Sequence, residues 1–186
     1  MKLLIATTNR HKVHEISHIL AEYGVEVSQL DIEAQEPDLG SLEKIAEHKA
    51  RQAYSNARRP LIAEDTGIYF DAYDDFPGVF AKRVFLGIGF RGLLALIRAA
   101  DSKAARFRTA ICYYDGRAAK VFSGELKGRL LEHLVSEEKD RLPYEKLFVP
   151  DGHSKALVEL PHGEKNRISH RAQAARKLGE WLAQRK

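Results

Sequence analysis

Residues 3–16 read LLIATTNRHKVHEI, and this stretch predicts how the fold begins. The apolar run Leu3 to Ile5 indicates a buried strand, and apolar residues at helical spacing from Val13 to Leu20 indicate a helix after it. Between them lie two threonines, an asparagine and a lysine, although a plain turn needs only glycine, proline or one Asx residue. Hydroxyl, amide and cationic groups at the start of a helix are typical of an anion site.

Helical and strand patterns alternate along the rest of the chain. We expect strands at 25–30 and 61–73, the second broken at 65–67, a hairpin around Asp115-Gly116, and helices after Ser41, around 93–97 and after Ser169. This alternation predicts an α/β or α+β class around a mixed sheet. At 186 residues the chain fits one domain, 1–186, or two closely joined lobes.

Composition narrows the class of protein. The 44% hydrophobic content supports a real core, and the net charge of +4 favours anionic partners without choosing among them. No run approaches the roughly 20 apolar residues of a membrane span, and the apolar stretch after Met1-Lys2 is too short for a signal peptide. The single cysteine, Cys112, lies in an apolar run, which predicts a core position and a cytoplasmic protein.

Two carboxylates stand at the predicted strand break, in Glu64-Asp65-Thr66-Gly67. An acidic turn would explain them, but carboxylate oxygens also suit Mg²⁺, and one carboxylate can accept a proton. The acidic segment 31–40 could bring a further carboxylate, although a loop of acids is commonly just exposed. We therefore treat Asp65 as a candidate metal ligand and proton acceptor.

A second polar cluster, Ser169-His170-Arg171, stands at the start of the last predicted helix. Ser169 needs no explanation beyond a helix N-cap. A histidine and an arginine there oppose the helix dipole, so we expect an anion or a polar ligand edge to offset their cost.

Two further patterns are read as structural. Gly87 to Gly92 matches GxGxxG, but the chain before it is a poor parallel strand, so the glycines fit a turn and helix entry rather than a dinucleotide site. A zinc site is not expected either, because the histidines are read as lacking both an HExxH motif and cysteine partners.

These pieces, in this order, resemble the inosine triphosphate pyrophosphatase family, the XTP/dITP diphosphatases, over nearly the whole chain. The matching motifs are [ST]xNxxK at residues 7–12, acid-Asp-[ST]-Gly at 64–67, PG at 77–78, FxGxxxG at 122–128 and KxxISHR at 165–171. Each motif alone is weak, whereas five in order at these spacings are specific.

The resemblance implies an elongated, two-lobed α/β fold around a long central mixed sheet, with the active-site cleft between the lobes. It also implies a homodimer that converts a nonstandard purine nucleoside triphosphate (ITP, dITP or XTP) and water into the monophosphate and pyrophosphate. No membrane and no specific nucleic acid is expected as a partner.

Roles for individual residues follow from the same resemblance. Asp65 would be the catalytic proton acceptor and a Mg²⁺ ligand, with Mn²⁺ as a substitute. Glu36 would be the second metal carboxylate, and Glu33, Glu43 and Glu64 remain alternatives to it.

The other predicted site residues would contact the nucleotide. Thr7 to Lys12 would hold the triphosphate, and Lys49 and Thr66 would also touch substrate. Lys165, His170 and Arg171 would bind from the other lobe. In full, the predicted substrate-binding residues are Thr7, Thr8, Asn9, Arg10, His11, Lys12, Lys49, Thr66, Leu142, Pro143, Tyr144, Glu145, Lys165, His170 and Arg171.

The sequence departs from the family pattern in the base-gripping segment. The family's GFGYDPxF is replaced by RLPYEKLF at 141–148, so both glycines are lost. Leu142 takes the place of the stacking aromatic residue, and Glu145 takes the place of the aspartate. The family's ENAxxKA also reads KIAEHKA at 44–50. Two alternative functions therefore stay open: a related pyrophosphatase with another base preference, and an inactive nucleotide- or RNA-binding protein.

Overall fold

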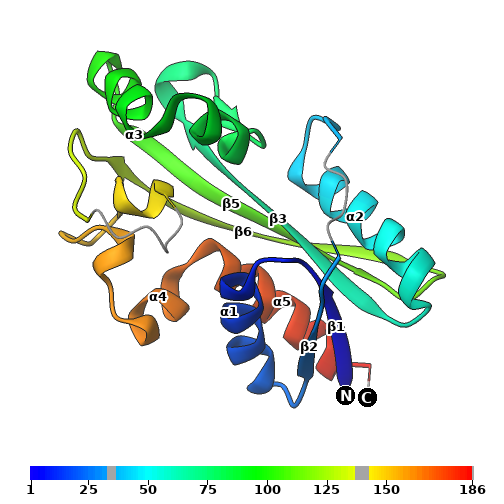
Figure 1. Cartoon of the computed structure of the whole chain (residues 1–186). Helices are drawn as coiled ribbons and strands as arrows, with labels where there is room; N and C mark the ends of the chain where they lie inside the picture. Colours follow the sequence, from blue (N-terminus) through cyan, green and yellow to red (C-terminus); the bar gives the residue numbers. More distant parts are fainter. Residues whose placement is uncertain (33–36, 137–142, 186) are drawn as a thin grey trace. The chain divides into compact units, whose positions relative to one another are not determined.

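A seven-stranded mixed sheet organises the computed structural model, which describes residues 1–32, 37–136 and 143–185. Its strand order is β2-β1-β3-β5-β6-β7, of which the first five are labelled in Figure 1, and β4 pairs with β3. The strands are β1 Lys2–Ala6, β2 Glu26–Leu30, β3 Leu61–Phe70, β4 Pro77–Gly78, β5 Ala104–Tyr114, β6 Ala119–Leu130 and β7 Phe148–Pro150. The α-helices in the described residues are α1 Arg10–Ala21, α2 Leu42–Ala57, α3 Ala81–Ala99, α4 His162–Ile168 and α5 His170–Ala183.

Both strand directions occur in this sheet. Strand β1 runs parallel to β2 and to β3, whereas β4 is antiparallel to β3 and β7 is antiparallel to β6. Parallel neighbours need a crossover, and the chain supplies α1 between β1 and β2 and α2 before β3. The α/β class with a mixed sheet is thus confirmed.

The chain divides into two compact units. Unit 1 comprises 1–66, 109–124 and 166–186, and unit 2 comprises 67–108 and 125–165. Strands β3, β5 and β6 contribute residues to both units. The cleft between lobes, expected from the family resemblance, stays a prediction.

Helices α1 and α5 build much of the core of unit 1, and they lie side by side in Figure 1. The inward positions expected from helical spacing are buried, among them Ile16 and Leu20 on α1 and Leu178 and Leu182 on α5. Each is at most 3% exposed, which confirms the predicted apolar faces. No helix among the described residues is long and apolar enough to cross a membrane.

Strand β3 continues through the expected break. It is one uninterrupted strand from Leu61 to Phe70, so the prediction of a break at 65–67 was wrong. Gly67 serves a close approach instead of a turn, because a Cβ at this position would lie 2.5 Å from the carbonyl oxygen of Gly78 on β4. The candidate acid Asp65 therefore projects from a rigid strand.

The GxGxxG stretch lies inside α3, where Gly89 interrupts the helix with φ 58° and ψ −168°. The residues before it, from Ala81, are helical and not a strand, so they lack the context of a dinucleotide fingerprint. Gly89 thus marks the entry to the second helical segment of α3, as expected, but Gly87 and Gly92 lie in helical backbone and not in a turn.

The predicted hairpin joins β5 to β6. Asp115 accepts hydrogen bonds from the backbone N–H groups of Arg117 and Ala118, both at 2.9 Å, and Gly116 adopts φ 91° in the turn. Cys112 on β5 is fully buried, which confirms its core position, and burial raises the pKa of its thiol to about 12.

Candidate active site

The polar loop after β1 caps α1. Asn9 is the N-cap, and its side-chain oxygen accepts hydrogen bonds from the N–H groups of His11 at 3.0 Å and Lys12 at 3.4 Å. The N–H group of Asn9 donates to the hydroxyl of Thr7 at 3.1 Å. A phosphate at this helix end would therefore compete with Asn9 for two of the backbone donors.

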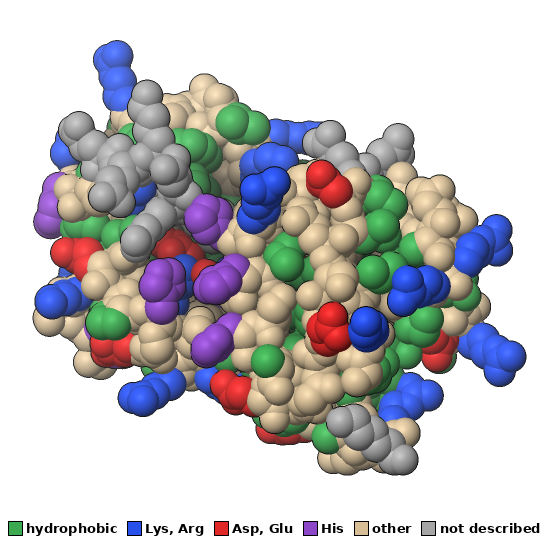
Figure 2. Space-filling model, turned by 60° about the horizontal axis from the view of Figure 1, so that its bottom comes forward, with side chains coloured by type: hydrophobic (Ala, Val, Ile, Leu, Met, Phe, Trp, Pro, Cys, Tyr) green, Lys and Arg blue, Asp and Glu red, His purple; other side chains and the backbone are tan. Residues whose placement is uncertain are grey.

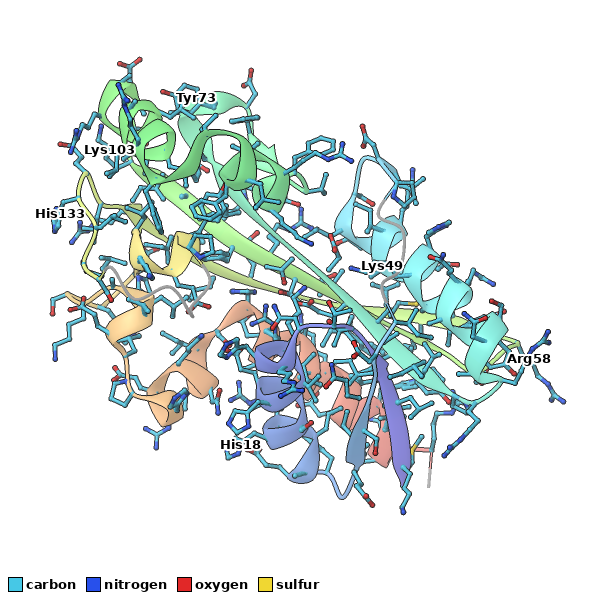
Figure 3. The ribbon with its side chains drawn as sticks, in the orientation of Figure 1. His18, Lys49, Arg58, Tyr73, Lys103 and His133 are labelled. Atoms are coloured by element: carbon cyan, nitrogen blue, oxygen red, sulfur yellow. The ribbon has the colours of Figure 1, made fainter. Side chains whose placement is uncertain are left out.

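Asp65 is held by a lysine from α2. The Lys49 Nζ atom lies 3.0 Å from Asp65 Oδ1 and donates to the carbonyl oxygen of Glu64 at 3.2 Å. Lys49 is 7% exposed because it lies on the buried face of α2, which faces the sheet (Figure 3). The predicted phosphate-binding lysine thus lies against the predicted base, as its ion-pair partner.

Glu64 is the centre of a second charge cluster, and its side chain is completely buried. It forms an ion pair with Lys12 from α1 and accepts a hydrogen bond from the Nε atom of Arg171 at 3.0 Å. The hydroxyl of Thr66 also donates to it. Two cations and a hydroxyl thus contact this one carboxylate, and its alternative role as a metal ligand stays a prediction.

Arg171 has its charge offset by the protein itself. This side chain is 1% exposed and binds Glu64 on β3 and Glu15 on α1. An anion or a polar ligand edge was expected to offset the cations at the start of α5, and for Arg171 the anions are the protein's own carboxylates. The two carboxylates come from α1 and β3, far away in the sequence.

His170 is fixed through a threonine from β5. Its Nδ1 atom lies 2.6 Å from the hydroxyl of Thr109, which also contacts the hydroxyl of Thr66. The backbone of His170 sits close to β6, because a Cβ on Gly124 would be 2.1 Å from the His170 carbonyl oxygen. The glycine of the FxGxxxG motif at position 124 is therefore explained by packing, because a larger residue would clash with the backbone of α5.

The two neighbouring acids differ in pKa. For Glu64, burial raises the pKa, but Lys12 and Arg171 lower it more, so it lies well below its usual range. For Asp65, burial dominates over the opposing effects of Lys49 and Lys12 and raises the pKa to about 6. A permanently ionised acid beside one that titrates near neutrality is typical of a catalytic site.

The predicted base-gripping segment belongs to unit 2. Glu145 is buried, and its Oε2 atom accepts a hydrogen bond from Lys165 Nζ at 2.8 Å, while its Oε1 atom has no hydrogen-bond partner among the described residues. Tyr144 is also buried, with its hydroxyl 2.8 Å from the Ala81 carbonyl oxygen and its ring against Phe70. These contacts give Tyr144 a packing role, and a substrate contact by it stays a prediction.

The structure brings some predicted site residues together in unit 1. These are Lys12, Lys49, Asp65, Thr66, His170 and Arg171. Thr8, Arg10 and His11 are exposed near the start of α1, whereas Pro143 is half-buried beside Tyr144 in unit 2.

Some predicted site residues lie in another unit than expected or outside the described residues. His170 and Arg171 share a unit with Asp65, so the expectation that they come from another lobe was wrong, and only Lys165 lies in unit 2. Glu36 and Leu142, together with the alternative Glu33, lie outside the described residues. The alternative Glu43 accepts a hydrogen bond from the Ser123 hydroxyl at 3.2 Å.

The oxygen atoms of Asp65 are compatible with one contact to a hard cation. Within 1–32, 37–136 and 143–185, no group of three or more His, Cys, Asp or Glu side chains is placed to hold a metal ion. Asp65 gives Oδ1 to Lys49, and its second oxygen can serve as one ligand. Magnesium in phosphate sites commonly uses one or two carboxylates together with the substrate's phosphates, so a single available carboxylate is compatible with it.

Two residues of this cluster were not predicted from the sequence. Glu15 pairs with Arg171, and Thr109 connects Thr66 to His170. The sequence gives only weak indications of them. Glu15 lies three residues after Lys12 and therefore on a neighbouring part of the same helix face. Thr109 is a hydroxyl-bearing residue among apolar strand residues. Only the tertiary contacts reveal their partners.

Comparisons with known proteins point to one family. The model of the Ham1 family matches residues 3–181. The chain is 38% identical to the dITP/XTP pyrophosphatase of Hyperthermus butylicus, over 98% of this chain and 95% of that one. It is 37% identical to the dITP/XTP pyrophosphatase of Methanopyrus kandleri, over 97% and 96%.

Solved structures agree with this match. A HAM1 protein from Coxiella burnetii superposes with a TM-score of 0.84 at 25% identity and 99% coverage of both chains. A nucleoside-triphosphatase / dITP/XTP pyrophosphatase from Mycobacterium abscessus gives a TM-score of 0.71 at 29% identity, over 96% of this chain and 98% of that one.

Proposed function

The chain belongs to the Ham1 family, and from this premise we propose that it cleaves nonstandard purine nucleoside triphosphates to the monophosphate and pyrophosphate. It is a hydrolase of nucleotide metabolism, and its substrates are ITP, dITP and XTP. Its likeness to dITP/XTP pyrophosphatases covers nearly the full length of both partners. The structural observation that carries the proposal is the pair of buried acids, Glu64 bound to Lys12 and Arg171, and Asp65 bound to Lys49.

Asp65 is the general base in this proposal. A base must be ionised at the working pH and still hold a proton once it has taken one, and a pKa of about 6 meets both demands. Lys49, at 3.0 Å, keeps the carboxylate in one orientation. The Asp65 carboxylate takes the proton of a water that attacks the α-phosphorus, and pyrophosphate leaves.

Charge balance explains why a divalent cation belongs to the reaction. Three cations, Lys12, Lys49 and Arg171, face three carboxylates, those of Glu15, Glu64 and Asp65. The cluster is therefore neutral and offers no surplus positive charge to a triphosphate. Mg²⁺, or Mn²⁺ in its place, would supply that charge to the phosphates, with Asp65 as a protein ligand and Glu36 as the proposed second one.

Lys12 binds the phosphates by exchanging its contact with Glu64 for one with a phosphate oxygen. Lys12 is 17% exposed in its side chain, whereas its partner Glu64 is fully buried, so Lys12 is the member of the pair that a phosphate can reach. Thr7 and Thr8 border the same helix start and add hydroxyl donors. Asn9 acts by fixing the loop, through the cap that it forms on α1.

Base selection is assigned to the Lys165–Glu145 pair. A 6-oxopurine presents an oxygen acceptor at position 6 and an N–H donor at position 1, whereas adenine reverses both. Lys165 is a donor, and the second oxygen of Glu145 is a buried acceptor without a described partner. Adenine would leave both groups unpaired, and a buried polar group without a partner costs about 1–3 kcal/mol.

The proposal extends to the protein's compartment and its oligomeric state. The protein acts in the cytoplasm, which the single, buried, free thiol of Cys112 supports because a reducing compartment needs no disulfide. It works as a homodimer, as the family resemblance suggests; equilibrium sedimentation that finds only monomers would contradict this.

The deciding experiment incubates the protein with ITP, XTP, dITP, GTP and ATP in the presence of Mg²⁺ and identifies the products. Pyrophosphate from ITP, with ATP cleaved far more slowly, is the expected result. Orthophosphate would mean that another bond is cleaved, and binding without turnover would favour the inactive nucleotide-binding alternative.

A matched pair of variants assigns the base. Asp65→Asn should lower ITP turnover by about 10²–10⁴, because asparagine cannot accept the proton. Asp151→Asn, on an exposed turn of unit 2, should leave turnover unchanged. Near-normal turnover by folded Asp65→Asn would remove Asp65 from the mechanism.

A further inference from the structure

The exposed face of helix α1 carries His14 and His18, which the proposed reaction does not use. Three of the eight histidines of the chain, His11, His14 and His18, fall within eight residues of this helix, and all three are exposed. Histidine side chains gather on one face of the molecule in Figure 2, and Figure 3 labels His18 on α1. The opposite face of the helix, with Ile16 and Leu20, is buried in the core.

His14 and His18 are four residues apart, in the sequence His14-Glu15-Ile16-Ser17-His18. This is the HExxH spacing, in which two imidazoles lie on the same helix face, about 5–6 Å apart at their Cβ atoms. The expectation of no zinc site rested on the absence of both an HExxH motif and cysteine partners. Its first premise was wrong, because residues 14–18 match that motif. A pair of imidazoles at i and i+4 can reach one metal ion without cysteine.

The glutamate of the motif is committed elsewhere. Glu15 forms the ion pair with Arg171, and its side chain is only 13% exposed. It is therefore not placed to activate a metal-bound water, as the glutamate of a hydrolytic HExxH site does. Among the described residues no third histidine, cysteine or carboxylate completes a metal cluster. These two facts exclude a peptidase-like centre on α1.

We propose that His14 and His18 form a surface site for a borderline divalent transition-metal ion such as Zn²⁺, with water in the remaining coordination positions. Imidazole nitrogen suits Zn²⁺, Ni²⁺ and Cu²⁺, whereas Mg²⁺ requires oxygen ligands. The site is thus chemically distinct from the one proposed at Asp65. A purely solvated helix face is the alternative, and it predicts no saturable binding.

The site has a structural consequence, because a metal ion bound to both imidazoles joins two successive turns of α1. An ion that binds only where the helix is formed stabilises the native state by mass action. Helix α1 also carries Lys12 and Glu15, which contact Glu64 and Arg171, so the stabilised helix is the one that supports the charge cluster.

The experiment titrates the whole protein with ZnCl₂ in a calorimeter, with MgCl₂ in excess so that oxygen-ligand sites are filled. We expect one saturable Zn²⁺ site. His14→Gln and His18→Gln should each weaken it by about 10–100-fold or more, since even the loss of a residue behind a metal ligand costs that much. His133→Gln, an exposed histidine of unit 2, is the matched control and should bind as the unmodified protein does.

Melting curves and the metal series give independent readouts. Zn²⁺ should raise the Tm of the unmodified protein and of His133→Gln but not that of His14→Gln or His18→Gln, each compared with its own Tm without metal. Affinity should rise from Mn²⁺ to Ni²⁺ to Cu²⁺. Absence of saturable Zn²⁺ binding, or binding that survives in both α1 variants, would overturn the proposal whatever the enzyme assay shows.

Discussion

Removing the guanidinium of Arg171 should destabilise the protein strongly and in a pH-dependent way. Arg171→Met keeps most of the side-chain volume and deletes the charge that binds Glu64 and Glu15. Breaking a buried ion pair typically costs about 3–5 kcal/mol, because the remaining charge is left uncompensated. Lys12 still contacts Glu64, so we expect the lower end, about 3 kcal/mol at pH 7.

The pH dependence follows from the pKa of Glu64. Burial raises this pKa, but Lys12 and Arg171 together bring it below the usual value. The ionised Glu64 therefore contributes stability above the unfolded carboxyl pKa of about 4.3 and loses it as the pH falls through the lower folded value. In Arg171→Met the pKa of Glu64 in the folded state is higher, because one of its two cations is gone. Glu64 then becomes protonated as the pH falls, which removes the uncompensated buried charge. The difference in the free energy of unfolding between the variant and the unmodified protein should therefore shrink from pH 7 to pH 3.

Urea unfolding at the two pH values measures this gap through the midpoint and the slope of the transition. Arg176→Met is the control, because the Arg176 guanidinium on the same helix donates to the neutral backbone carbonyls of Asn166 and Arg167. Its loss should be smaller and nearly independent of pH. A gap below about 1 kcal/mol for Arg171→Met at pH 7, or an equal gap at both pH values, would refute the account of a buried, charged Glu64.

Three further outcomes are expected. The kcat/KM for ITP should fall below about pH 6, because burial raises the pKa of Asp65 to about 6 and the base must be ionised; a flat profile across that range would contradict this. Lys12→Ala should weaken ITP binding far more than inosine binding in calorimetry, whereas equal losses would assign Lys12 to the pair with Glu64 alone. Gly124→Ala should cost about 1–3 kcal/mol in urea unfolding because its Cβ would meet the His170 carbonyl oxygen, whereas Gly163→Ala, with no neighbour within 4 Å, should cost much less.

Local periodicity was enough to predict most helices and strands. The buried positions on α1 and α5 repeat at helical spacing, and that pattern depends only on which face meets the core. The break predicted in β3 failed because Asp65-Thr66-Gly67 has turn chemistry, whereas Gly67 is needed for the close approach of Gly78. A contact between separate strands cannot be read from three adjacent residues.

The sequence motifs predicted several residues of the candidate site, but they did not predict which of these side chains pair with one another. The motif positions led to Lys12, Asp65 and Arg171, but the sequence did not say that Glu64 joins Lys12 to Arg171, because these residues come from three distant segments. Thr109 gave no signal beyond a hydroxyl in an apolar strand. Side-chain partners depend on which elements are neighbours, and that is a tertiary property.

The buried thiol of Cys112 makes this protein a convenient host for chemical labels. With no exposed surface and a pKa raised to about 12, Cys112 presents almost no thiolate to an alkylating reagent at neutral pH. A cysteine introduced at the surface becomes the one reactive thiol. Spin labels at Asn56→Cys in unit 1 and Lys155→Cys in unit 2, both exposed positions, would therefore report the distance between the units, with and without nucleotide, in an otherwise unaltered protein.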